Sequence, residues 1–352
     1  MVERGLEQSS GVFCNGYKVL SGCGIYSEMD ELPKFSARFP WFGGDLQTIS
    51  NQIRPTLDKN LINGQKTILP MSDNDEALAA CATHINSDND KPVIIMLHGL
   101  GGDENSIYMR EAAQFFNING YKVLRLNLRG AGSSAKTSFN IYHAGISQDI
   151  RQIMSFLPTE ISKNGVYLMG FSLGANIVLK YLGEGNVPSF VKGGVAVSPP
   201  IDLAKSQHRI AEFRNRLYRR YLLKKIKKDF SQIRWADGNA PIRSVDELSS
   251  IIEFDEHVIA PVHGFDDAYD YYDKSSSKNF INNISTPTMI IHAQTDPWIL
   301  SEQFDEISWR ENNSVCTIMA EDGGHVGFSG RHNKYPWHLN VANIFFNLLL
   351  NR

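Results

Sequence analysis

From residue 91 to the C-terminus, short β-branched runs alternate with longer amphipathic stretches. Such runs are typical of strands buried on both faces, and the stretches between them have the length and spacing of helices. The predicted strands lie at residues 92–97, 121–126, 166–169, 194–197, 288–292 and 315–319. The predicted helices lie at residues 107–119, 144–157, 172–182, 301–308 and 336–350. This order predicts an α/β fold with a mostly parallel central sheet flanked by helices.

Two further stretches precede the parallel part. Residues 65–69 and 77–84 alternate between apolar and polar side chains and flank a turn at 73–75. They predict a pair of antiparallel strands at one edge of the sheet, which makes the strand at 194–197 the sixth along the chain.

A long stretch after this sixth strand, from about residue 202 to 284, interrupts the alternation. It is rich in Arg, Lys, Asp and Tyr, and it contains a predicted helix at 214–228 but no strong strand. We therefore expect a lead-in segment over residues 1–60 and one domain over residues 61–352. Within that domain, residues 202–284 form a helical lid inserted after strand 6.

Composition excludes several classes of protein. The 35 Lys and Arg residues against 38 Asp and Glu residues leave a net charge of −3, which predicts neither a nucleic-acid binder nor a polybasic membrane-surface protein. The four cysteines form no CxxC pair, so neither a zinc ribbon nor a disulfide framework is expected. Cys14 and Cys23 could bridge in an oxidising compartment, but two free thiols are the favoured interpretation. Charged residues near the N-terminus and the lack of a long apolar run favour a cytoplasmic location.

The sharpest motif is the segment GFSLG at residues 170–174, a G-x-S-x-G between a predicted strand and a predicted helix. A nucleophile on such a tight turn needs very small neighbours two residues away on either side, which Gly170 and Gly174 supply. The turn also aims Ser172 at a helix N-terminus, where free N–H groups can stabilise an oxyanion. We expect Ser172 to be a catalytic nucleophile rather than part of a purely structural turn.

A serine hydroxyl needs a histidine base and an acid that orients it. In folds with this motif the acid follows a late strand and the histidine follows the last one. Asp296 comes directly after the strand at 288–292, and His325 comes just past the strand at 315–319. We therefore predict Ser172, His325 and Asp296 as a triad. Because Ser172 precedes the insertion and the other two follow it, one sheet must close around a single site.

Other residues compete for these roles. The competing acids are in the insertion, and the competing histidines lie within a strand, in the insertion or in the tail. They are Asp266, Asp267 and Asp270, and His208, His292, His332 and His338.

The segment HGLGG at residues 98–102 ends the strand at 92–97 and predicts the loop that supplies a second oxyanion donor. The expected donors are the main-chain N–H groups of Leu100 and Leu173. A phosphate-binding loop is the weaker alternative, since the segment lacks both the GKS/GKT ending and the G-x-G-x-x-G spacing. Arg129, in a glycine-rich loop after the next strand, is expected to tie neighbouring loops together.

The predicted helix at 214–228 carries Leu217, Tyr221, Leu222 and Ile226 near one face, with Arg and Lys around the others. In one interpretation this apolar stripe packs over the mouth of the site and the basic face is solvated. In the other, the helix is a basic amphipathic element that makes transient contact with anionic lipid or an acidic acyl substrate.

Together these motifs resemble the YheT-like (EMB-type) members of the α/β-hydrolase superfamily, from about Phe42 to the C-terminus. The matching segments are LQT (46–48), HGLGG (98–102), GFSLGAN (170–176), KYLGE (180–184), FDE (254–256), GFDDA (264–268), YY (271–272) and GGHVGF (323–328). Two positions depart from the family pattern: Asp45 replaces a usual histidine, and Ala175 replaces a common glycine.

The resemblance implies an α/β-hydrolase fold and hydrolysis or transfer of acyl groups from carboxylic esters, including medium-chain esters and, in some relatives, phospholipids. The resulting hypothesis is a serine esterase that acts through an acyl-enzyme on a small-molecule acyl ester, with no metal or organic cofactor. The alternatives are an acyltransferase that passes the acyl group to an alcohol, a phospholipase-type enzyme and, less favoured, a non-catalytic hydrolase-like binding protein.

Overall fold

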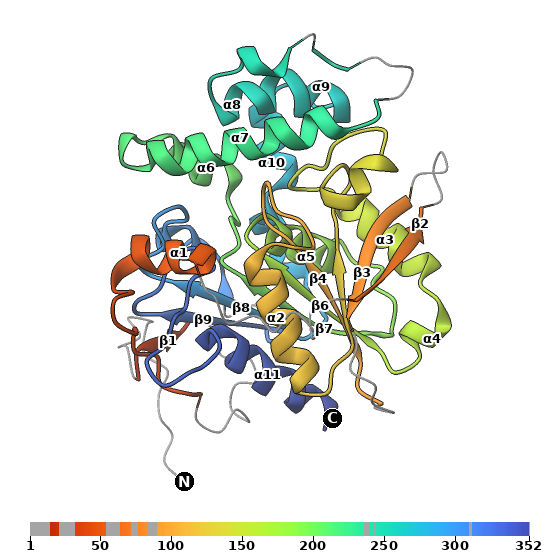
Figure 1. The fold of residues 1–352 in the computed structure, drawn as a ribbon. Helices are drawn as coiled ribbons and strands as arrows, with labels where there is room; N and C mark the ends of the chain where they lie inside the picture. Colours follow the sequence, from red (N-terminus) through yellow and green to blue (C-terminus); the bar gives the residue numbers. More distant parts are fainter. Residues whose placement is uncertain are drawn as a thin grey trace.

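A nine-stranded sheet runs through the centre of the computed structural model (Figure 1). The structure describes residues 15–20, 32–53, 64–71, 77–83, 90–235, 240–242, 244–309 and 312–351. In spatial order the strands are β1 (Tyr17–Val19), β9 (Val315–Ala320), β8 (Thr288–Ala293), β7 (Val191–Val197), β6 (Val166–Phe171), β4 (Val93–Leu97), β5 (Val123–Leu126), β3 (Ala77–Thr83) and β2 (Gln65–Pro70). The strands from β9 to β5 are parallel, and antiparallel strands close both edges.

The six predicted parallel strands and the predicted antiparallel edge pair are confirmed at their positions. Strand β1 was not predicted; its three residues pair with β9, with Tyr17 opposite Ala320. The strand before the insertion is therefore the seventh in the chain rather than the sixth. Cys14 and Cys23, for which a disulfide and two free thiols were both considered, lie outside the described residues.

Helices cover both faces of the sheet, and side chains of each strand alternate between them. In β4, Ile94 and Met96 pack with α2 (Ile107–Ile118) and α11 (Trp337–Leu350), whereas Ile95 and Leu97 pack with α3 (Ser147–Phe156) and α5 (Leu173–Gly183). The remaining helices outside the insertion are α1 (Gly43–Ile53), the short α4 (Thr159–Ser162) and 3₁₀ turns that include Ser301–Phe304. This last turn is shorter than the helix predicted at 301–308.

In its described residues the insertion between β7 and β8 contains helices joined by loops and no strand, and it lies across the top of the sheet in Figure 1. It contains α6 (Leu203–Ala211), α7 (Arg216–Gln232), α8 (Ile251–Phe254), a π-helical turn (Asp255–Ile259), α9 (Ala260–His263) and α10 (Ala268–Ser275). Helix α7 confirms the helix predicted at 214–228. None of the helices in the described part of the chain is long and apolar enough to cross a membrane.

The apolar stripe predicted for α7 is divided in the structure. Leu222 and Ile226 are buried in the core beneath the helix, but Leu217 is 72% exposed and Tyr221 is 45% exposed. The four residues therefore do not share one packed face. At the start of α7, Asn215 and Tyr218 make the contacts with the rest of the protein, and Leu217 does not.

Arg129 has a structural role, but its main partner is a residue of helix α3 and not, as was predicted, of a neighbouring loop. Its Nη2 and Nε donate to the two carboxylate oxygens of Asp149 on α3, at 2.6 and 3.1 Å. Asp149 is only 3% exposed, so this bidentate pair is largely desolvated. Breaking such a pair leaves a buried charge without its counterion.

We expect Arg129→Ala to lower the free energy of unfolding by about 3 kcal/mol, because the Asp149 carboxylate is left buried without its cation. Urea denaturation measures this loss. The matched control is Lys274→Ala, which removes the cation from an exposed pair with Asp270 and should cost much less. Equal losses in the two variants would contradict the structural role of Arg129.

Candidate active site

Ser172 sits on a sharp turn between β6 and α5, with its backbone in a left-handed conformation at φ 52°. This turn has no room for larger neighbours. A Cβ atom at Gly170 would lie 2.3 Å from the carbonyl oxygen of Gly174, and one at Gly174 would lie 2.5 Å from that of Leu97. The two glycines are therefore required for the chain to pass from strand to helix at this point.

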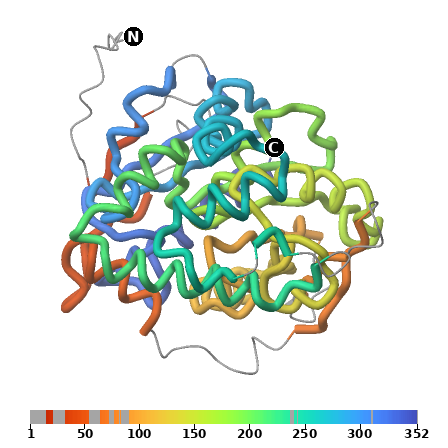
Figure 2. Tube along the Cα trace, turned by 90° about the horizontal axis from the view of Figure 1, so that it is seen from above, coloured from red at the N-terminus to blue at the C-terminus, as the bar shows by residue number. Residues whose placement is uncertain are grey.

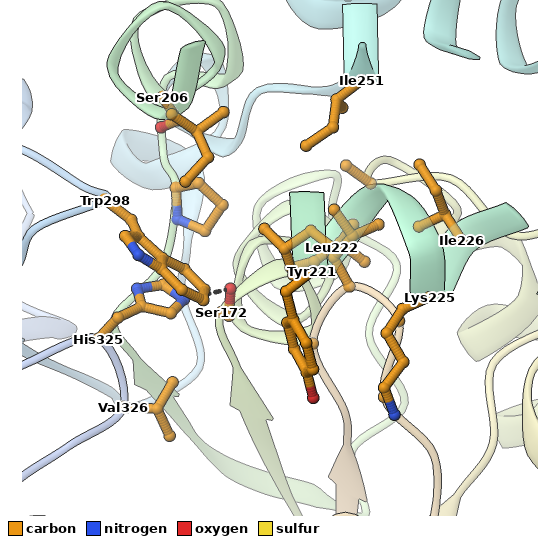
Figure 3. Close-up of a pocket in the computed structure, with 18 of the residues that line it drawn as sticks. Ser172, Ser206, Tyr221, Leu222, Lys225, Ile226, Ile251, Trp298, His325 and Val326 are labelled. Atoms are coloured by element: carbon orange, nitrogen blue, oxygen red, sulfur yellow. Dashed lines mark hydrogen bonds between the residues drawn. The ribbon is translucent and has the colours of Figure 1, made fainter. Parts of the chain in front are cut away.

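The structure brings the predicted triad residues together, and Figure 3 shows the contact between His325 and Ser172. His325 Nε2 lies 2.7 Å from Ser172 Oγ, and His325 Nδ1 lies 2.9 Å from Asp296 Oδ2. The other carboxylate oxygen of Asp296 accepts hydrogen bonds from the main-chain N–H groups of Trp298 and Ile299, at 2.8 and 3.0 Å. The Trp298 ring packs beside His325, with 4.3 Å between ring centroids. The acid, the base and the hydroxyl thus form one hydrogen-bonded chain.

Asp296 is held in its ionised form. Burial acts to raise its pKa, but the charge of His325 and the hydrogen bond to that ring act in the opposite direction. His292 and the N–H of Trp298 add to this effect, and the net pKa of Asp296 lies below its ordinary value. An ionised Asp296 can fix the tautomer of His325 that leaves Nε2 free to accept a proton.

The other histidines and acids considered for the roles of base and acid lie away from Ser172. His292 is buried inside β8 with Nε2 against the carbonyl oxygen of Ile299, and burial lowers its pKa to about 4. His338, on α11, packs against the rings of Phe171 and Phe328, His208 lies against Tyr269, and His332 is exposed. The three insertion acids surround the start of α10: Asp267 caps the helix, and Asp270 accepts hydrogen bonds from the main chain of Asp266 and from Lys274.

The loop after β4 lies against Ser172. A Cβ atom at Gly99 would come within 3.0 Å of the Ser172 Cβ. The N–H of Gly99 donates to Tyr108 Oη at 2.9 Å, and that of Gly101 donates to Tyr142 Oη at 2.7 Å.

The main-chain N–H groups of Leu100 and Leu173, the predicted oxyanion donors, find no acceptor among the described residues, and both residues line the cavity at Ser172. They are free to donate to a bound group. Tyr108 and Tyr142, which hold the HGLGG loop, were not predicted, since nothing in their local sequence marks them.

Helix α1 holds the His325 loop, a role that sequence reasoning missed. Thr48 Oγ1 accepts from the N–H of His325 at 2.8 Å and donates to the carbonyl oxygen of Gly44 at 2.7 Å. Asn51 Nδ2 donates to the carbonyl oxygen of His325 at 3.1 Å. Both main-chain polar groups of His325 are therefore satisfied by this helix. The LQT element at 46–48 was the available signal, but its function could not be derived from the pattern.

Glycines in the His325 loop allow it to approach helix α1 this closely. A Cβ atom at Gly324 would lie 2.3 Å from the Thr48 nitrogen, and one at Gly327 would lie 2.1 Å from the Gln47 carbonyl oxygen. Between them Val326 adopts φ 58°, a strained conformation for a β-branched residue, and its N–H donates to Ser198 Oγ at 3.1 Å.

Asp45, the residue that departs from the family pattern, also has a structural partner. It accepts hydrogen bonds from Arg214 Nη2 at 3.0 Å and from Tyr218 Oη at 3.2 Å. It therefore links α1 to the start of the lid.

A cavity of about 430 Å³ opens at Ser172 and His325 and extends beneath the lid (Figure 3). Its lid wall is mainly apolar and includes Leu222, Ile226, Ile251, Phe254 and Ile259. Among the described residues, no group of His, Cys, Asp or Glu side chains is arranged to hold a metal ion.

Two buried lid carboxyls stand out near this cavity. Asp255, which lines it, accepts a 2.6 Å hydrogen bond from Tyr272 Oη, and burial raises the pKa of Asp255 to about 7. Asp229 on α7 accepts from Tyr142 Oη at 3.3 Å, and burial likewise raises its pKa to about 7. Since Tyr142 also holds the N–H of Gly101, the lid is connected to the HGLGG loop.

The chain matches known proteins over most of its length. The family model described as "alpha/beta hydrolase fold" matches residues 92–330. YheT of Escherichia coli is 30% identical over 249 residues, which cover 70% of this chain and 73% of that protein. A monoacylglycerol lipase of Saccharomyces cerevisiae is 30% identical over 267 residues, 72% of this chain but only 58% of the yeast protein. An esterase structure from Pyrococcus furiosus superposes with a TM-score of 0.52 at 22% identity, covering 78% of this chain and 88% of that one, which supports the fold.

The buried carboxyl of Asp255 gives stability a distinct pH dependence. Between the ordinary pKa of about 4 and its folded value of about 7, the folded protein keeps a proton that the unfolded chain has lost, so stability falls as pH rises through this window. Asp255→Asn removes this loss. The measured quantity is the free energy of unfolding of the variant minus that of wild type, from urea denaturation. We expect this difference to increase by about 3 kcal/mol from pH 5 to pH 8.

The control for this experiment is Asp246→Asn, which removes the same charge from an exposed site in the insertion. A stability difference between Asp255→Asn and wild type that is the same at both pH values would contradict the prediction.

Proposed function

The chain belongs to the α/β-hydrolase family, among its YheT-like members, and on this basis we propose that it is a serine esterase that cleaves carboxylic acyl esters. The observation that carries the proposal is the continuous hydrogen-bonded chain from Ser172 through His325 to Asp296. The esterase and lipase names of similar proteins support the same class of reaction.

In the proposed mechanism, His325 Nε2 takes the proton of Ser172 as Oγ attacks the ester carbonyl carbon. The carbonyl oxygen becomes an oxyanion, which the N–H groups of Leu100 and Leu173 stabilise. The tetrahedral intermediate then collapses: the bond to the alcohol oxygen breaks, and His325 returns the proton to that oxygen. The acyl group remains on Ser172 as an ester.

Water completes the cycle. It attacks the acyl-enzyme carbonyl while His325 accepts its proton, a second oxyanion forms at the same two N–H groups, and the carboxylic acid leaves as Ser172 regains a proton. Asp296 stabilises the positively charged imidazole in both halves without accepting a proton itself. Apart from the substrate and this water, the proposed route uses side chains and main-chain groups of the site.

The substrate we propose is a small-molecule ester with an apolar acyl chain, because the lid wall of the cavity is lined mainly by aliphatic and aromatic side chains. Transfer of the acyl group to an alcohol would proceed through the same acyl-enzyme. Product analysis in added ethanol measures the partition between the acid and the ethyl ester. We also propose that the basic helix α7 makes transient contact with a lipid surface, which would suit a lipase-type substrate.

We expect Ser172→Ala and His325→Ala to lower kcat on p-nitrophenyl butyrate by about 10⁵- to 10⁶-fold and Asp296→Asn by about 10⁴-fold, because the three groups act as a unit. The matched controls are Ser231→Ala and His332→Ala, which change exposed residues of the same types outside the cavity and should retain wild-type rates. Wild-type activity in Ser172→Ala would exclude it as the nucleophile.

The contact between Thr48 and His325 predicts a positioning effect. Thr48→Val leaves the buried N–H of His325 without its acceptor but keeps the shape of the cavity wall. We therefore expect kcat to fall by about 10- to 100-fold with little change in KM, because the imidazole is displaced. Thr48→Ser keeps the hydroxyl and should restore most of the rate. If Thr48→Ser is as slow as Thr48→Val, the loss comes from packing and not from this hydrogen bond.

A further inference from the structure

Exposed apolar side chains gather around the mouth of the cavity. Of the twelve large hydrophobic residues that are exposed in the described part of the chain, eight lie in residues 39–53 or 213–221. We call these eight residues the apolar rim: Phe39, Phe42, Leu46, Ile49, Ile53, Phe213, Leu217 and Tyr221. Single hydrophobic residues scattered over a surface are ordinary. Here most of them lie in two short segments, which indicates an interaction surface.

The two segments form one surface although they are far apart in sequence. Asp45 of α1 accepts hydrogen bonds from both Arg214 and Tyr218 at the start of the lid. Figure 2 shows the segment around α1 beside the lid helices. The rim also borders the cavity, since Thr48 and Asn51 of α1 and Tyr221 of α7 line it.

Helix α1 presents two different faces. Gln47, Thr48, Ser50 and Asn51 are buried against the His325 loop. Leu46, Ile49 and Ile53 are exposed, and their spacing of three and four residues places them in one stripe on the outside of the helix. The fold explains the buried polar face. The exposed apolar stripe has no partner among the described residues, although exposing it to water is unfavourable.

The charge beside the rim indicates what covers it. Helix α7 contains seven basic residues and one acidic residue, Asp229, which is buried. The basic residues are Arg216, Arg219, Arg220, Lys224, Lys225, Lys227 and Lys228. An apolar stripe next to a dense positive charge matches the boundary between the acyl chains and the headgroups of an anionic lipid layer. A symmetric dimer through this face would instead bring two such helices together, and like charges at an interface are unfavourable.

We propose that the apolar rim and the basic residues of α7 together dock the protein on an anionic phospholipid surface, with the cavity mouth toward the lipid. The rim side chains enter the acyl boundary and the Arg and Lys side chains contact the headgroups. In this orientation an ester can pass from the lipid layer to Ser172 without crossing bulk water. The role of the surface in delivering substrate rests on the proposed esterase function, whereas the docking itself does not.

The experiment measures co-sedimentation with phosphatidylcholine vesicles that contain or lack phosphatidylserine. The test variant is the triple substitution Ile53→Ser, Phe213→Ser and Leu217→Ser, none of which lines the cavity. The matched control is Ile68→Ser, Ile118→Ser and Phe156→Ser, which removes three exposed hydrophobic residues outside the rim. A third variant, Arg220→Glu, Lys224→Glu and Lys228→Glu, reverses exposed charges of α7.

We expect wild type and the control to bind the phosphatidylserine vesicles and the rim variant to bind them at least about tenfold more weakly. The charge variant should lose the preference for phosphatidylserine, and salt should weaken wild-type binding. Hydrolysis of a soluble short-chain ester should be unchanged in the rim and control variants.

The proposal is overturned if wild type does not bind the vesicles or if the rim variant binds as wild type does. It is also overturned if the wild type is a dimer that the rim substitutions convert to a monomer without changing vesicle binding. Measuring Ser172→Ala in parallel separates the two proposals: vesicle binding by an inactive Ser172→Ala supports both, and retained activity in this variant contradicts the esterase function alone.

Discussion

The parallel pairing of β7 with β8 determines where the rest of the site lies. Val197 pairs with Ile291, and the next N–H, of Ser198, donates to the Ile291 carbonyl oxygen at 2.8 Å. The insertion leaves the sheet at the carboxyl end of β7 and, because the two strands are parallel, returns to the opposite edge of the sheet to enter β8. Since β6 and β9 flank this pair in the same direction, Ser172, Asp296 and His325 emerge at the same edge as the lid.

Much of this arrangement could be predicted from the sequence, because the strands are apolar runs and the order of serine, acid and histidine follows the strand ends. Other parts could not. Strand β1 has only three residues, too few for a periodic signal. Helix α1 buries Gln47, Thr48, Ser50 and Asn51, so its buried face is polar and does not show the apolar stripe by which helices are recognised. Polar burial of this kind depends on a partner loop nearly 280 residues later in the chain.

Backbone strain is present on both sides of the Ser172–His325 hydrogen bond. Ser172 and Val326, which follows His325, both have φ above 50°. Such conformations are unfavourable for residues with a side chain and persist only where the surroundings enforce them. Here glycines pressed against neighbouring backbone enforce both: Gly170 and Gly174 around the serine, and Gly324 and Gly327 around the histidine loop. The backbone on both sides thereby holds the side chains of Ser172 and His325 in position for their hydrogen bond.

Tyr142 joins the insertion to the sheet at a chemically sensitive position. Its hydroxyl holds the N–H of Gly101 and meets Asp229 of α7, and a Cβ atom at Gly101 would lie 2.5 Å from the Lys225 Cβ. Helix α7 is thus a side wall of the loop that carries the Leu100 N–H, and not only a cover above the cavity. Replacing this insertion with that of a relative would change the support of the loop as well as the shape of the cavity. The insertion therefore affects both the range of substrates and the alignment of the Leu100 N–H. A change in it that widens the range of substrates must also keep this N–H aligned.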